Sequence, residues 1–230
     1  MTKVNDEPGC IFYGWTVNDD KSKMMCREIY VDGEAARDHF PKAVAVVGKI
    51  LQSGAVSLDA FNVLGSATDL AIAKPEADKL GCVYWELYGE DWKKVMQVAE
   101  KVTSSKSFCT FQPSFKILDM AKAEAGLKKA TEDTKAEAGC LFYGWYISGD
   151  KLFCREGYES GAAVDKHLKE NALPVVGPML EAGALSLAGV ELHGPESEWA
   201  ACKETIDSLG GKYFDVYDSW SKFEKLGKLA

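Results

Sequence analysis

Two stretches of the sequence bring a carboxylate, a phenol and an imidazole together at identical spacing. In each, a Glu precedes a Tyr by two residues and a His follows nine residues after the Tyr: Glu28, Tyr30 and His39, then Glu156, Tyr158 and His167. A carboxylate among aromatic side chains either accepts a hydrogen bond from a tyrosine or has a raised pKa, and perturbed carboxylates are typical of catalytic sites. Two interpretations of the Glu stay open here: it is part of an acid–base site, or it only accepts a tyrosine hydrogen bond within a packed core.

The three histidines have different settings. His39 and His167 fall early in expected helices, where a lone His is more often a surface or packing residue than a catalyst. His193 occurs only in the second stretch, where the first has Leu64, so it could distinguish the second site from the first. No carboxylates cluster with these histidines at ligand spacing, and we therefore expect no metal site.

Both stretches belong to an internal duplication. Residues 7–17 and 137–147 share the pattern E-x-G-C-x-F-Y-G-W, and the matches continue in three further pairs of segments: 25–40 and 153–168, 46–58 and 175–187, 80–88 and 209–217. The offset between equivalent residues moves only from 130 to 128 to 129, so we expect short insertions in loops. The repeats are predicted at 7–90 and 137–220, with a helical linker over 91–136 and a tail over 221–230.

Each copy has the same expected order of elements. In the first copy, alternating aromatic and β-branched residues predict a hairpin of strands over 10–17 and 24–30. The pattern then predicts helix, strand, helix and strand over 34–52, 56–64, 67–80 and 82–88. The second copy follows suit, with its second helix over 196–209 and its fourth strand over 212–217. Each unit is therefore ββαβαβ, with two helices on one face of a mainly antiparallel sheet.

The other face of each sheet needs a cover, because an exposed apolar sheet face is unstable. The duplication supplies a second face of the same kind, so we expect the two units to pack sheet to sheet within one chain about a pseudo-twofold axis. The linker has helical patterns over 92–102 and 115–129 and is expected to cross over on the outside of the pair.

The hairpin register indicates which side chains share a face. Centring each turn on its loop sets a Trp opposite a Cys, a Tyr opposite the Glu, and an aliphatic residue opposite the second Tyr. The pairs are Trp15–Cys26, Tyr13–Glu28 and Ile11–Tyr30, and Trp145–Cys154, Tyr143–Glu156 and Leu141–Tyr158. Arg27 and Arg155 face the opposite side, either as structural ion pairs or snorkelling side chains, or as an anion clamp.

Composition excludes several classes of function. The formal net charge of −8 argues against a nucleic-acid partner, which would need a basic face. No stretch of about 18 apolar residues predicts a membrane span, and the polar start lacks the apolar run of a secretory signal. Seven cysteines without a C-x-x-C pair indicate reduced thiols and a cytoplasmic location.

The motif E-x-Y followed by H at this spacing, led in by E-x-G-C and an aromatic strand, resembles the antibiotic biosynthesis monooxygenase (ABM-like) domains. That resemblance covers about 50 residues of each copy. It implies an α+β fold in which two ferredoxin-like ββαβαβ units pack sheet to sheet as a dimeric α/β-barrel, here fused in one chain. The sequence departs from the family by starting each unit at the hairpin, without a preceding strand and helix, and by adding a helix and strand at the end.

The resemblance also implies a monooxygenase that needs no cofactor and acts on a small phenol- or quinol-type substrate. Glu156 and His167, with Glu28 and His39 in the first copy, would be the catalytic residues. The residues expected to contact the aromatic substrate are Tyr143, Trp145, Tyr158, Tyr13, Trp15, Tyr30 and His193. The alternatives are a non-catalytic binder of a small apolar ligand and a structural or interaction module. The chain is expected to be a monomer with an internal pseudo-dimer, which could associate further.

Overall fold

Each repeat begins with the predicted β-hairpin. In the computed structural model, which describes residues 7–89 and 108–221, these are β1 (Cys10–Asn18) with β2 (Met24–Tyr30), and β6 (Cys140–Ser148) with β7 (Lys151–Tyr158). The pairings of the Trp with the Cys and of the first Tyr with the Glu are confirmed in both hairpins. The last predicted pair is wrong by one residue, because a bulge sets Cys10 opposite Tyr30 and Cys140 opposite Tyr158.

The first repeat continues with α1 (Gly33–Gln52), β3 (Asn62–Gly65), α2 (Ala67–Ala77), a 3₁₀ turn η2 (Asp78–Leu80) and β4 (Val83–Tyr88). The side chains of Asp32 and Ser66 begin the two helices, since each accepts a hydrogen bond from a backbone N–H of the first turn. The predicted strand over 56–64 is shortened to four residues. The part that is lost has no neighbouring strand among the described residues to bond with.

The second repeat has α5 (Gly161–His167), a π-helical turn η3 (Leu168–Ala172), α6 (Leu173–Glu181), β8 (Leu185–His193), α7 (Glu196–Trp199), α8 (Lys203–Ser208) and β9 (Lys212–Ser221). The single helix predicted over 196–209 is wrong, because the segment breaks into α7 and α8. Each piece is tied separately to α5: the Gly161 N–H donates to the Glu198 carboxylate, and the Thr205 hydroxyl donates to Asp165.

The segment between the repeats differs most from expectation. Instead of a purely helical linker on the outside, it supplies β5 (Cys109–Ile117) and α4 (Met120–Lys135). β5 is a central strand, bonded antiparallel to β7 on one side and to β8 on the other. The helix predicted over 92–102 and most of the C-terminal tail lie outside the described residues.

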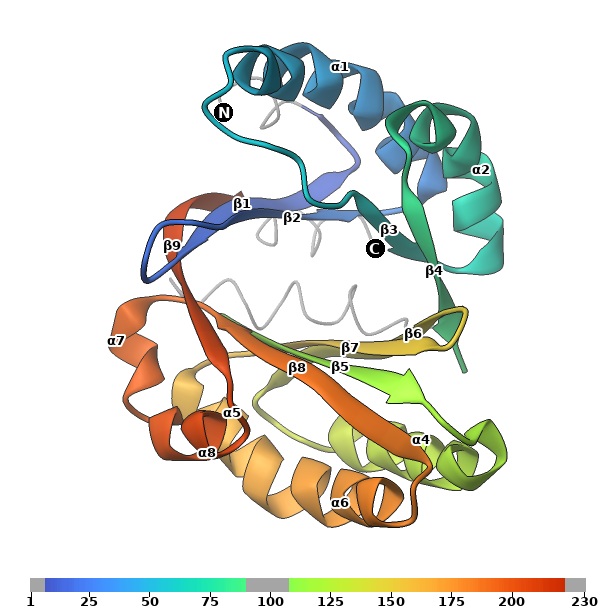
Figure 1. Ribbon diagram of the computed structural model, residues 1–230, viewed down its shortest axis with the longest axis vertical. Helices are drawn as coiled ribbons and strands as arrows, with labels where there is room; N and C mark the ends of the chain where they lie inside the picture. Colours follow the sequence, from blue (N-terminus) through green and yellow to red (C-terminus); the bar gives the residue numbers. More distant parts are fainter. Residues whose placement is uncertain (1–6, 90–107, 222–230) are drawn as a thin grey trace.

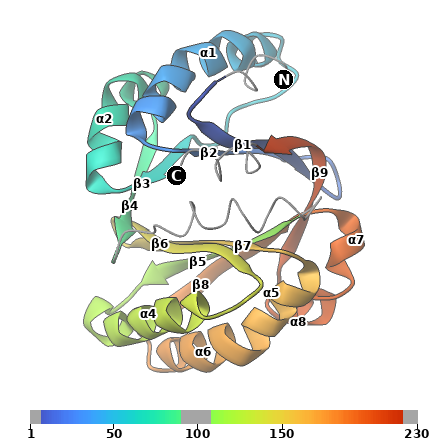
Figure 2. The ribbon, with the colours of Figure 1, turned by 180° about the vertical axis from the view of Figure 1, so that it is seen from behind.

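All nine described strands belong to one mixed sheet, in the order β2-β1-β9-β8-β5-β7-β6-β4-β3. The last strand of each repeat pairs with the first strand of the other, β9 with β1 and β4 with β6. This exchange curls the sheet into a barrel-like shape with helices on its outer side, α1 and α2 over one half and α4 to α8 over the other (Figures 1 and 2).

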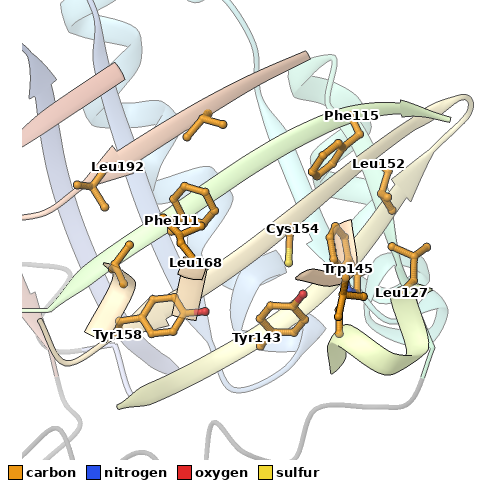
Figure 3. Packing of buried hydrophobic residues seen from close by; sticks show 14 of the residues in the cluster. Phe111, Phe115, Leu127, Tyr143, Trp145, Leu152, Cys154, Tyr158, Leu168 and Leu192 are labelled. Atoms are coloured by element: carbon orange, nitrogen blue, oxygen red, sulfur yellow. The ribbon is translucent and has the colours of Figure 1, made fainter. Parts of the chain in front are cut away.

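The larger described core lies between the sheet and the helices of the second repeat. It contains Leu127 of α4, Leu168 of η3 and Met179 of α6, packed against the aromatic side chains of β5 and β6 (Figure 3). The first repeat has a smaller cluster around Phe40, Leu70 and Ala77. Within the two described ranges, no helix combines the length and the apolar character required to cross a membrane.

Candidate active site

A pocket opens between the sheet and the η3–α6 helix of the second repeat. Its cavity volume is about 50 Å³, within about 480 Å³ of non-atom space that includes open solvent. Its walls are almost entirely apolar, with Phe111 and Phe115 from β5, Leu168 from η3 and Val176 from α6. Figure 3 shows the aromatic side chains of β5 and β6 gathered on this face of the sheet.

Glu156 is the only acidic or basic side chain among the residues that line the pocket. It is buried, and the Tyr158 hydroxyl donates a hydrogen bond of 2.7 Å to its Oε2. His167 Nε2 lies 3.2 Å from the same oxygen, an ion-pair distance, but the angle is too poor for a hydrogen bond and the N–H has no other partner among the described residues. The predicted Glu–Tyr–His motif is therefore one connected cluster at the pocket wall.

A second carboxylate holds the other side of the imidazole. His167 Nδ1 lies 2.8 Å from Glu137 Oε1, and the Asn171 side-chain amide donates to the same oxygen. His167 is buried, whereas Glu137 is partly exposed. The imidazole thus bridges a pocket carboxylate and a carboxylate near the surface.

The two carboxylates change the proton affinity of the imidazole. Burial alone would lower the pKa of His167, but the negative charges of Glu156 and Glu137 outweigh it and raise the pKa to about 9. Burial also raises the pKa of the Tyr158 and Tyr143 hydroxyls well above their usual value, and Glu156 adds to both effects. At neutral pH the cluster therefore contains an imidazolium and protonated phenols.

Trp145 and Tyr143 also line the pocket, on the strand next to Glu156. Their rings meet edge to face, with centroids 5.8 Å apart. Trp145 is buried, and its indole N–H has no hydrogen-bond partner among the described residues. Buried donors without a partner are rare in proteins. This N–H belongs to a residue of the pocket wall but is itself covered, so an oxygen atom of a bound molecule would reach it only after neighbouring side chains shift.

The π-helical turn next to His167 explains one of the offsets between the repeats. Equivalent residues are 128 apart at His39 and His167 but 129 apart at Val46 and Val175. One extra residue therefore lies in this helix, and a π-turn absorbs such an insertion without ending the helix. The expectation that insertions occur only in loops is wrong here, and the affected turn supplies Leu168 and Ala172 to the pocket wall.

The first repeat holds the same cluster in a more open setting. The Tyr30 hydroxyl donates to Glu28 at 2.5 Å, His39 Nδ1 lies 3.0 Å from Glu7, and Cys26 donates to Glu28 at 3.2 Å. Tyr13 lies opposite Glu28, and Trp15 is half-buried. Among the described residues no strand equivalent to β5 lies beside β2, so no described strand walls this cluster as β5 walls the second site.

His193 lies apart from both clusters. It is fully buried, stacks on Phe214 with ring centroids 4.5 Å apart, and contacts Thr16 at 2.9 Å and Glu191 at 3.3 Å. Burial, with a contribution from Arg27, lowers the pKa of His193 to about 4, although Glu191 opposes the shift. It is not among the pocket-lining residues, so the structure does not bring it to the substrate position expected for it.

Sequence reasoning identified Glu156, Tyr158, His167, Tyr143 and Trp145 together, but it assigned no role to Glu137 or Asn171. The signal for Glu137 was present, because Glu7 and Glu137 occupy the same place in the two copies of E-x-G-C. Asn171 lies in the π-turn, and the first copy has Ala43 at the same distance after its His, so the duplication gave no signal for it. The described residues contain no group of three His, Cys, Asp or Glu side chains placed to bind a metal ion.

No protein-family model matches this sequence, and no curated protein matches it. Among solved structures, MupZ from Pseudomonas fluorescens is 25% identical over 50% of this chain and 94% of its own, with a TM-score of 0.44. A candidate monooxygenase from Fusobacterium nucleatum is 12% identical over 95% of this chain and 81% of its own, with a TM-score of 0.47. Another from Lactobacillus acidophilus is 11% identical over 83% and 78%, with a TM-score of 0.41.

Proposed function

We propose that the chain is an ABM-like monooxygenase that needs no cofactor and oxidises a small phenol- or quinol-type substrate in the second-repeat pocket. One observation carries the proposal: a carboxylate, Glu156, and an unpartnered indole N–H, that of Trp145, lie buried in the wall of an apolar pocket, just behind its apolar surface. A flat aromatic molecule with one hydroxyl and one carbonyl would satisfy both. With no cationic side chain in the lining, the pocket favours a neutral substrate.

The architecture is part of the same proposal. We infer two fused ferredoxin-like units at 7–90 and 137–220, which form an internal pseudo-dimer in a monomeric chain. The reciprocal pairing of β9 with β1 and of β4 with β6 supports this arrangement. A cytoplasmic location also belongs to the proposal and is supported by the seven cysteines, all of which are free.

In the proposed reaction, Glu156 takes a proton from the bound substrate, and the resulting anion is the electron donor to O₂. For a ring CH₂ that is conjugated to a carbonyl through the flanking aryl rings, as in an anthrone, the balance is R₂CH₂ + O₂ → R₂C=O + H₂O. The substrate supplies all the electrons, so no external reductant is needed. The Trp145 N–H would hold the carbonyl oxygen, on which negative charge accumulates. His167 would hold Glu156 in place and compensate its charge, while Glu137 orients the imidazole.

The test is oxygen uptake with a panel of anthrones and hydroquinones. We expect the wild type to consume oxygen and Glu156→Gln to reduce the rate of uptake about 100-fold or more. His167→Ala, as a separate single variant, should also reduce the rate strongly. Trp145→Phe keeps the ring and removes only the donor, so it should lower turnover less. The matched control is Glu28→Gln, the same change in the open first site, which should retain most of the uptake.

A non-catalytic binder of a small aromatic ligand is the second candidate. It is favoured by the fact that Tyr158 and His167 both engage Glu156 Oε2, as they would if the carboxylate only closed a polar corner of the core. Tight binding of an aromatic ligand without oxygen uptake on any substrate would establish this function and refute the monooxygenase. If the protein neither binds an aromatic ligand nor consumes oxygen, both functions are refuted.

A further inference from the structure

The pocket beside Glu156 has two ends that differ in burial and in the type of side chain. Its aromatic lining residues, Phe111, Phe115, Tyr143 and Trp145, are all buried, as is Glu156, and Figure 3 shows these aromatic rings together on the sheet. The lining residues that are exposed or partly exposed are instead aliphatic or small: Ala172, Leu173, Val176, Gly177, Leu180, Leu187 and Leu209. We call the first group the aromatic end of the pocket and the second group the aliphatic end.

Most of the aliphatic end belongs to one face of α6. Four of its residues follow the spacing i, i+3, i+4 and i+7, which places them on the same side of a helix: Leu173, Val176, Gly177 and Leu180. Another side of α6 packs on α4, where Met179 lies against Gly126. Gly177 is therefore the one member of the pocket-facing set that has no side chain.

Neither packing nor backbone conformation requires a glycine at this position. A Cβ on Gly126 of α4 would lie 2.4 Å from the sulfur of Met179, so packing explains that glycine, whereas a Cβ on Gly177 would meet no atom within 4 Å. Gly177 is not among the glycines with positive φ. Because glycine inside a helix is destabilising relative to alanine, the space that it leaves in the pocket wall needs another explanation.

The size of the pocket points to α6 as the wall that moves when a ligand enters. A cavity of about 50 Å³ is smaller than the apolar cavity of about 150 Å³ that holds benzene. α6 follows directly on the π-turn, and Pro178 has no N–H to donate to the carbonyl of Pro174 one turn earlier. A ring that enters by displacing this helix leaves its outer part beside Gly177.

We propose that Gly177 is a specificity-determining residue, which leaves a passage along the aliphatic end for an unbranched apolar chain attached to the ring bound beside Glu156. The chain runs outward past Gly177 and covers Leu187 and Leu209. A polar chain would lose its hydrogen bonds to water, since the side chains of the aliphatic end offer no donor or acceptor. The inference rests on the proposed binding of an aromatic ring in this pocket, but not on the oxidation of that ring.

The experiment is isothermal titration calorimetry of the complete chain with 4-ethylphenol, 4-butylphenol and 4-hexylphenol. We expect the affinity of the wild type to rise about three- to fourfold per added CH₂. Gly177→Leu fills the passage, so it should bind 4-ethylphenol within about twofold of the wild type but 4-hexylphenol about tenfold or more weakly. Gly177→Ala should give an intermediate loss, and its added Cβ has room, so it should unfold at the same temperature as the wild type or higher.

The matched control is Gly48→Leu, the same change at the equivalent position of α1, where a Cβ also meets no atom within 4 Å. It should bind all three phenols as the wild type does. Wild-type affinity that does not depend on chain length would overturn the inference, and so would a Gly177→Leu variant that weakens all three ligands equally or none of them. In these cases the ring still binds and the proposed function stands. If none of the phenols binds to the wild type, the proposed aromatic pocket is refuted together with the passage.

Discussion

The stability of the protein should fall as the pH rises above neutrality, because His167 holds its proton more tightly when folded. Its pKa rises from 6.5 to about 9, through the charges of Glu156 and Glu137 acting against burial. A raised folded-state pKa stabilises the protein fully below about pH 6.5, and that stability is lost as the pH rises through about 9. The full effect is about 3 kcal/mol at about 1.4 kcal/mol per tenfold change in proton affinity. Between about pH 6 and pH 8.5 the expected loss is about 2 kcal/mol.

The assay is urea unfolding at several pH values in that window, for the wild type and His167→Gln. Thiols and tyrosines titrate in both proteins and cancel in the difference between them, which should shrink by about 2 kcal/mol from pH 6 to pH 8.5. His193→Gln is the control of opposite sign: the pKa of about 4 keeps His193 neutral in the folded protein, while in the unfolded chain it titrates near 6.5, so the difference from the wild type should grow, by less than about 1 kcal/mol, over the same window. If His167→Gln folds poorly, Glu137→Gln can be used in its place. It removes one of the two negative charges and should reduce the dependence of the unfolding free energy on pH. A difference that stays constant with pH would refute the imidazolium between two carboxylates.

Three further predictions test the packing. Gly161→Ala should destabilise the fold by about 2 kcal/mol or more, because a Cβ would overlap a backbone carbonyl of α7. In Gly48→Ala, on α1, the added Cβ meets no atom within 4 Å, so this variant should be more stable by about 0.5–1 kcal/mol in urea unfolding. Leu152→Ala should cost about 2–5 kcal/mol, because Leu152 is fully buried, and the equivalent Met24→Ala less than about 0.5 kcal/mol, because Met24 is 47% exposed; equal costs would show that Met24 is buried as well. Deleting Ala172 should convert the π-turn to α-helix, with far-UV circular dichroism unchanged but affinity for an aromatic ligand in the pocket reduced about tenfold.

Local pattern was sufficient for the hairpins and for the cluster on them. The two hairpin loops differ in length but predict the same register, so the sequence alone places Tyr143 opposite Glu156. Alternation along a strand then assigned Trp145 to the pocket side and Arg155 to the other. The bulge at Cys140 cannot be predicted from the sequence, because one extra residue does not change the types of residue in the strand.

The elements that the sequence predicts wrongly are those whose formation depends on a neighbouring strand or helix. Residues 56–61 have the alternation of a strand, yet without a neighbour their backbone groups form no ladder, so the predicted strand shrank to Asn62–Gly65. The sequence pattern assigns residues 109–117 to a linker, yet they form a central strand, with β7 and β8 on its two sides. The helix predicted over 196–209 is two shorter helices, each of which is hydrogen-bonded separately to α5.

The sequence by itself determined that one unit occurs twice, which side chains share a face, and that each copy places Glu, Tyr and His within reach of one another. These follow from periodicity and spacing, which are local properties of the chain. Only the tertiary structure decided that the two copies are unequal. A strand from between the repeats closes the pocket at Glu156, and no described strand does so at Glu28. Burial is set by what packs against a residue, so identical motifs became one closed site and one open site.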